Sequence, residues 1–170
     1  MTLHSEDSRP VNWIAAGLAI GLAGGLAEVL VVGGYAGVAG ADAANVAGAI
    51  ATAVRVDAGS AIVGLAVHMA MAAGLGLALL AGAKGSGLLR DGSARRIYAM
   101  ALLALGAIWS LNFLVVLPVL SPGFVHLLPY PVTLASKLMF AVAAVATLRS
   151  MPADALSRWR PSGATARASA

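Results

Sequence analysis

Four long runs of apolar residues alternate with short polar segments along this chain. We expect these runs to form helices at about residues 12–35, 60–83, 97–120 and 131–149. A helix of about 20 apolar residues, rising 1.5 Å per residue, matches the roughly 30 Å hydrocarbon core of a bilayer. The pattern therefore predicts an all-α integral membrane protein. Its single domain, residues 11–149, is expected to be a four-helix transmembrane bundle between polar tails at 1–10 and 150–170.

A shorter and more polar segment, residues 42–56, separates the first two runs. Val46, Ile50 and Val54 recur every fourth residue in it, while Arg55 lies off that stripe. This period is typical of an amphipathic helix, and the segment is too short and too polar to cross a bilayer. We expect a short interfacial helix between the first and second spans.

The first run has a competing interpretation as a cleavable signal peptide, because small residues near position 40 resemble a cleavage site. The apolar core of a signal peptide spans about 7–15 residues. The run from Val11 to Val38 is about 28 residues long and contains a carboxylate, Glu28. We therefore expect a retained transmembrane helix.

The composition agrees with a chain embedded in lipid. Hydrophobic residues make up 60% of the sequence and charged residues only 11%, against about 25% charged in an average soluble domain. The absence of cysteine excludes disulfides and thiolate chemistry. The net charge of +4 does not indicate nucleic acid, because most basic residues stand at the ends of apolar runs. There they can meet lipid headgroups, so the expected partner is the lipid bilayer.

The basic residues also predict the orientation of the chain. Nine of the eleven Lys and Arg residues lie in segments 1–10, 84–96 and 149–170. Of the other two, Arg55 follows the first span and Lys137 lies inside the fourth. By the positive-inside rule, both termini are expected in the cytoplasm, with the spans in the inner (cell) membrane.

Glycines mark the faces on which the spans are expected to pack. In the first span they recur every fourth residue, and in the second span two glycines share a face with small residues between them. The positions are Gly17, Gly21, Gly25, Gly64 and Gly76. Small residues at this spacing allow two helix backbones to approach closely.

Each span contributes one strongly polar residue to a single predicted layer: Glu28, His68, Asn112 and Lys137. Counted from the expected outer helix ends, all four lie about 9–12 Å deep at 1.5 Å per residue. We expect Glu28 and Lys137 to form an ion pair, with the other two hydrogen-bonded around it. Three interpretations of the layer stay open. It can be a structural network that holds the helices in register, a proton, ion or ligand site open to the outer side, or a contact with another subunit.

Catalytic and metal sites are not expected. No serine has a general base placed beside it, and the chain holds only three histidines. His68 and His126 are the candidates for binding a haem or a quinone, although they belong to different predicted elements. We expect no enzyme activity, no bound metal and no cofactor.

In general topology the chain resembles the small four-span subunits that accompany larger bacterial respiratory or other redox complexes. This resemblance implies an accessory subunit that supplies helix packing rather than catalysis, with other membrane subunits as its partners. Two alternatives remain. One is a small independent proton- or ion-coupled transporter that uses the polar layer, and the other is a haem- or quinone-binding electron carrier.

Overall fold

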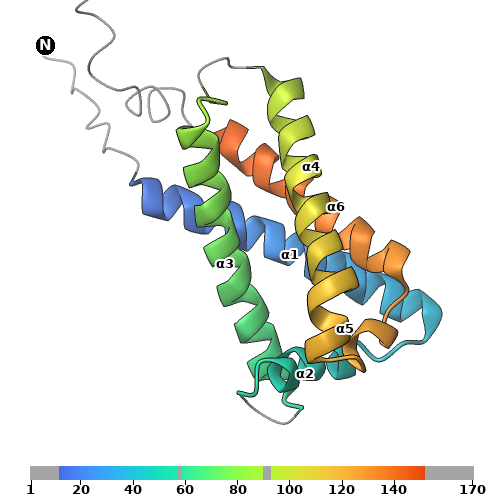
Figure 1. Ribbon diagram of the computed structural model, residues 1–170. Coiled ribbons are helices and arrows are strands. Elements are labelled where there is room, and N and C mark those ends of the chain that lie inside the picture. The colour runs from blue at the N-terminus through green and yellow to red at the C-terminus, as the bar shows by residue number, and fades with distance from the viewer. Residues whose placement is uncertain (1–11, 57–58, 90–92, 152–170) are drawn as a thin grey trace, which may run out of the picture.

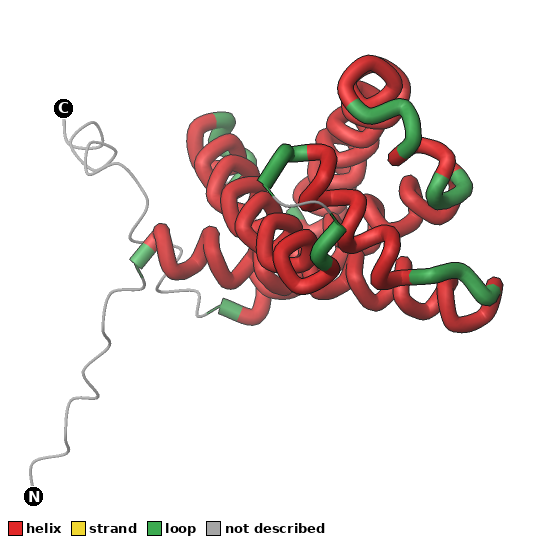
Figure 2. Tube along the Cα trace, turned by 90° about the horizontal axis from the view of Figure 1, so that it is seen from below, coloured by secondary structure: helices red, strands yellow, loops and turns green. Residues whose placement is uncertain are grey.

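The described part of the chain is helical nearly throughout. The computed structural model describes residues 12–56, 59–89 and 93–151, and Figure 2 shows helices joined by short loops with no strand among them. Four of the helices are long and apolar enough to cross a membrane: Trp13–Ala39, Ala61–Gly85, Ala94–Leu120 and Tyr130–Ser150. The prediction of an all-helical chain with four such helices is confirmed.

The four long helices form two layers, and one of these layers is the central pair α1 and α6. In the back layer of Figure 1, α1 (Trp13–Ala39) and α6 (Tyr130–Ser150) lie side by side. In front, α3 (Ala61–Gly85) packs across α1, and α4 (Ala94–Leu111) packs across α6. Within the described residues no comparably close backbone contact joins α3 to α4. The central pair therefore holds the bundle together, and the core gathers on α6 around the fully buried Phe140.

The first helix is longer than its sequence pattern suggested. We expected it to end near residue 35, but α1 continues to Ala39. Its end is set by Gly40, which takes the left-handed conformation at φ 67° and donates its backbone N–H to the carbonyl of Ala36. Glycine adopts this conformation without a steric penalty, so it is a common stop for a helix.

The third apolar run contains a π-helical turn that the sequence pattern did not reveal. After α4 comes η1 (Asn112–Val116), followed directly by the short helix α5 (Leu117–Leu120). The backbone N–H of Leu117 donates to the carbonyl of Asn112, five residues back. The turn lies just before Pro118, whose ring lacks an amide hydrogen and disturbs the regular α-helical pattern.

The shorter helices gather at one end of the bundle, at the bottom of Figure 1. α2 (Ala43–Ala53) packs on the beginning of α3 and also contacts η2 (Phe124–His126). A helix is present in the expected segment, although it is shorter than residues 42–56. It ends because Arg55 leaves the helical region with φ 58°.

Candidate functional site

Glu28 is a buried carboxylate on the inner face of α1, and only 6% of its side chain is exposed. It shares that face with Gly21, Gly24 and Gly25, because these positions all fall within about 100° of arc at 3.6 residues per turn. The inner face points toward both α3 and α6, the two helices that pack on α1. An ionised group in this position requires a charged or hydrogen-bonding partner.

Lys137 of α6 supplies the opposite charge. Its Nζ lies 2.5 Å from Oε1 of Glu28, so the structure contains the ion pair expected from the sequence. Phe140, one turn further along α6, lies beneath the ammonium group, whose Nζ is 5.6 Å from the ring centroid. Gly24 leaves room for that ring, since a Cβ at this position would lie 2.6 Å from it. The inner face of α1 thus contacts both Lys137 and the ring of Phe140 that lies beneath its ammonium group.

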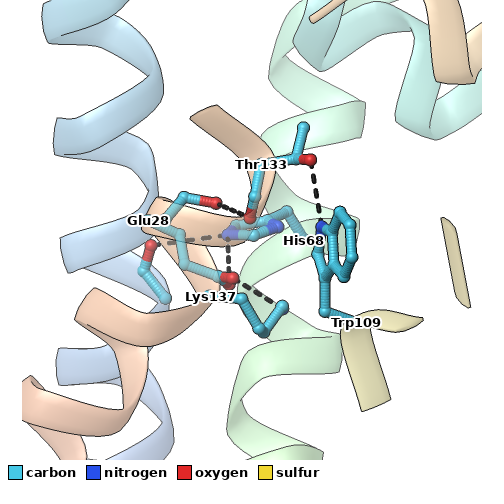
Figure 3. A network of polar contacts seen from close by, with 7 residues as sticks. Glu28, His68, Trp109, Thr133 and Lys137 are labelled. Atoms are coloured by element: carbon cyan, nitrogen blue, oxygen red, sulfur yellow. Dashed lines mark hydrogen bonds and ion pairs between the residues drawn. The ribbon is translucent and has the colours of Figure 1, made fainter. Parts of the chain in front are cut away.

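His68 reaches the same carboxylate from α3 (Figure 3). Its Nε2 lies 3.4 Å from the carbonyl oxygen of Gly25 and 3.6 Å from Oε2 of Glu28. Both neighbours are hydrogen-bond acceptors, so we assign the hydrogen of the neutral ring to Nε2. α3 comes this close because Gly21 lies directly against the backbone of Ala72 and has no side chain in the way.

The three side chains form a triad that connects three helices: Glu28, His68 and Lys137 (Figure 3). The carboxylate is nearly enclosed, whereas the side chains of His68 and Lys137 are 22% and 18% exposed. With the imidazole neutral, the two formal charges of the triad cancel. No buried side-chain nitrogen or oxygen in the described part of the chain lacks a hydrogen-bond partner. The arrangement can hold the helices in register, and it can also bind a proton.

Asn112 is the one residue of the predicted layer that the structure does not bring into the triad's contacts. It is half-buried at the start of the π turn η1. The polar contact from α4 to α6 comes instead from Trp109, whose Nε1 donates to Oγ1 of Thr133 at 3.0 Å. That hydroxyl in turn donates to the carbonyl of Tyr130 at 3.0 Å.

Thr133 and Ser136 are buried polar residues that the sequence reasoning missed. The hydroxyl of Ser136 donates to the carbonyl of Thr133 at 2.9 Å, so it is satisfied within its own helix. Spacing could have identified Thr133, since it precedes Lys137 by four residues and therefore lies on the same face of α6. Its small side chain carries no charge and gave no signal in an apolar run.

Aromatic rings close the end of the bundle beside this contact. Trp109 stacks on Phe113 with ring centroids 5.6 Å apart, and Tyr130 meets the indole edge-on at 6.0 Å. Phe124 of η2 lies 6.3 Å from the ring of Phe113. Such ring pairs add to the stability of a packed interface, and here they join the end of α4 to η2 and to the start of α6.

Four of the five predicted packing glycines lie where α1 meets α3. Cβ atoms placed at Gly17, Gly21 and Gly25 would collide with α3, and one placed at Gly76 would collide with the backbone of α1. Gly64 also allows a close approach, but to a different helix, since its neighbour is the carbonyl of Ala47 in α2.

The structure does not bring the two candidate cofactor ligands together in one set of contacts. His126 is exposed in η2, whereas His68 is directed at Gly25 and Glu28. Among the described residues there is no group of three His, Asp or Glu side chains that could hold a metal ion.

Comparison with known proteins adds no family and no fold relative: no protein-family model, curated protein or solved structure matches the chain. Any function must therefore be argued from the residues themselves.

Proposed function

We propose that this chain is an accessory subunit of a larger complex in the bacterial inner membrane, of the respiratory or another redox type. It contributes helix packing and has no catalysis of its own. The concentration of basic residues in segments 1–10, 84–96 and 149–170 supports a cytoplasmic position for both termini.

The outward face of α1 is the observation that carries this proposal. Leu26 and Leu30 are 54% and 66% exposed on it. Further along the same face are Gly33, Gly34 and Gly37, and no atom of the described residues lies within 4 Å of a Cβ placed at any of them. At 3.6 residues per turn, all five positions fall within about 100° of arc, opposite the face that holds Glu28.

Glycines in a helix need a compensating contact. Each costs about 1 kcal/mol of helix stability relative to alanine, and lipid chains gain little from a flat surface. Against another helix the same residues are useful, because they allow close packing of backbones. The inner face of α1 uses Gly21 and Gly25 in this way against α3. By the same reasoning, the outward glycines suit a helix of another subunit.

The exposure of α4 supports the same proposal. The long helix that contains α4, Ala94–Leu120, buries the smallest share of its residues among the four long helices. The exposed side of α4 includes Met100, Leu103 and Leu111. An apolar surface of this kind can face lipid or a partner. Together with the glycine face of α1, it leaves two sides of the molecule open for subunit contacts.

Substituting one outward glycine tests the proposal, with a glycine on another helix as the control. Gly37→Leu adds bulk to the outward face, and Gly74→Leu adds the same bulk to the exposed side of α3, where nothing lies within 4 Å either. Tagged chains are purified from native membranes in a mild detergent. We expect wild type and Gly74→Leu to co-elute with a larger complex that bears a chromophore, and Gly37→Leu to elute alone with an unchanged circular-dichroism melting curve.

If the wild-type chain itself elutes as a monomer or small oligomer, the proposal is wrong. The independent proton- or ion-coupled transporter then becomes the better candidate. Equal retention of Gly37→Leu and Gly74→Leu in the complex would show instead that the outward face of α1 is not the interface.

A further inference from the structure

We infer that His68 is a reversible proton-binding site of this protein. The neutral ring donates to the carbonyl oxygen of Gly25, and the protonated ring binds the carboxylate of Glu28. Proton uptake would thereby add an ionic link between α3 and α1 to the existing ion pair between α6 and α1. The inference stands on the geometry of the triad and does not depend on the subunit role.

The position of the ring between two acceptors is the first argument. Nε2 of His68 lies 3.4 Å from the carbonyl oxygen of Gly25 and 3.6 Å from Oε2 of Glu28. Gly25 and Glu28 are three residues apart on α1, so one N–H can turn from one acceptor to the other. A charged ring favours the carboxylate, because N⁺–H···O⁻ hydrogen bonds are shorter and stronger than neutral ones, at about 2.7–2.9 Å.

The two oxygens of Glu28 are used differently. Oε1 is paired with Lys137, whereas Oε2 faces the imidazole. A proton taken from water adds to Nδ1 of His68, no covalent bond of the chain breaks, and the ring becomes an imidazolium with both nitrogens protonated. The net charge of the triad rises from zero to +1, and Glu28 is then shared between two cations.

Exposure distinguishes the imidazole from the carboxylate. The side chain of His68 is 22% exposed, while that of Glu28 is 6% exposed. The imidazole therefore reaches the surface of the bundle, whereas the carboxylate is enclosed. Of the three side-chain types in the triad, histidine is the one that proteins most often use for reversible proton binding.

In the described part of the chain, the helices around His68 present few charged groups to it. α1 presents only Glu28, and α6 presents Lys137. Trp109 and Ser110 of α4 and Asn112 of η1 have no side chain that titrates near neutral pH, and α2 (Ala43–Ala53) contains no ionisable side chain. The charge state of His68 should therefore depend on Glu28 and Lys137, and in opposite directions.

The opposite effects expected of Glu28 and Lys137 on the charge of His68 can be tested directly. The protein is labelled with ¹⁵N-histidine, reconstituted in phosphatidylcholine bilayers and titrated from about pH 5 to 8 by NMR, with the His68 signals assigned by their loss in His68→Gln. An opposite or like charge within about 4–6 Å moves a titration by about 1–3 pH units. We expect Glu28→Gln to move the His68 midpoint to lower pH and Lys137→Met to move it to higher pH, each by at least about one unit. His126 is exposed in η2, outside the contacts of the triad, and its signals serve as the internal control.

The inference is overturned if the wild-type His68 ring stays neutral down to about pH 5, or if the two substitutions move its midpoint in the same direction or not at all. Should Glu28→Gln fail to fold, Glu28→Asp shortens the carboxylate by one methylene while keeping its charge. We then expect a smaller downward shift, and an unchanged midpoint would count against the inference.

Discussion

Neutralising either member of the Glu28–Lys137 pair should destabilise the protein, and neutralising both should cost less than the two single changes together. The two charged atoms are 2.5 Å apart, and the side chains are only 6% and 18% exposed. Removing one partner of a buried pair leaves the other charge unpaired and costs about 3–5 kcal/mol. Because Lys137 is partly exposed, we expect the lower end, about 3 kcal/mol of unfolding free energy for each of Glu28→Gln and Lys137→Met. The double variant should lose about 2–3 kcal/mol less than the sum.

Reversible unfolding in mixed micelles, followed by circular dichroism, supplies the four free energies of this double-mutant cycle. Glu28→Gln combined with Arg149→Met is the control cycle. Arg149 is exposed and lies twelve residues, or about 18 Å, along α6 from Lys137, so the control should be additive within about 0.5 kcal/mol. If the Glu28–Lys137 cycle is equally additive, the two residues do not interact in the folded protein and the reasoning about the triad fails.

Three further pairs of substitutions test the packing and the backbone conformation. Gly21→Ala should lower the free energy of unfolding by about 3 kcal/mol, because its Cβ would strike the backbone of α3. Gly33→Ala should be neutral or raise the free energy of unfolding by up to about 1 kcal/mol. Unfolding in the same mixed micelles compares the two variants. Trp109→Phe keeps an aromatic ring but loses the hydrogen bond to Thr133, so we expect a loss of about 1 kcal/mol, measured against the conservative Thr133→Val. Arg55→Gly relieves a left-handed backbone at φ 58° and should raise the unfolding free energy by about 1 kcal/mol, while Arg55→Ala, which keeps the conformation, should not.

The sequence predicts the helices well because their signal is long and uniform. An apolar run of 20 or more residues allows few structures other than a helix, so the four long helices follow from hydrophobicity alone. Their ends depend on single residues. Nothing in the pattern distinguishes the helical Gly37 from Gly40, which ends α1 at φ 67°. The π turn at Asn112–Val116 is equally local, and the nearby Pro118 indicates a disturbance without indicating its form.

The site is predicted only in part. Counting residues from the expected helix ends gives the depth of a polar side chain in the bundle, but it does not show which neighbouring helix that side chain faces. Glu28 and Lys137 are the only charged residues in the middle of their helices, so their pairing follows from the cost of leaving either alone. For α4 the choice between Asn112 and Trp109 depends on which face turns toward α6. Trp109 and Asn112 are three residues apart and therefore lie near one another on the helix surface, and the indole rather than the amide meets Thr133. Polarity favoured asparagine, although the longer side chain of tryptophan also carries a hydrogen-bond donor.

The two faces of α1 show how one helix can serve two purposes. On the inner face, glycines bring α3 and α6 close enough for His68 and Lys137 to meet the carboxylate of Glu28. The outer face repeats the glycines without a partner helix from the described part of the chain. Since the triad ties α3 and α6 to the same helix, any shift of α1 caused by a partner on its outer face would alter the distances around Glu28. Conversely, a change in the charge of His68 would act on the helix that presents the outer face. The proposed interface and the proposed proton site are therefore mechanically connected through α1.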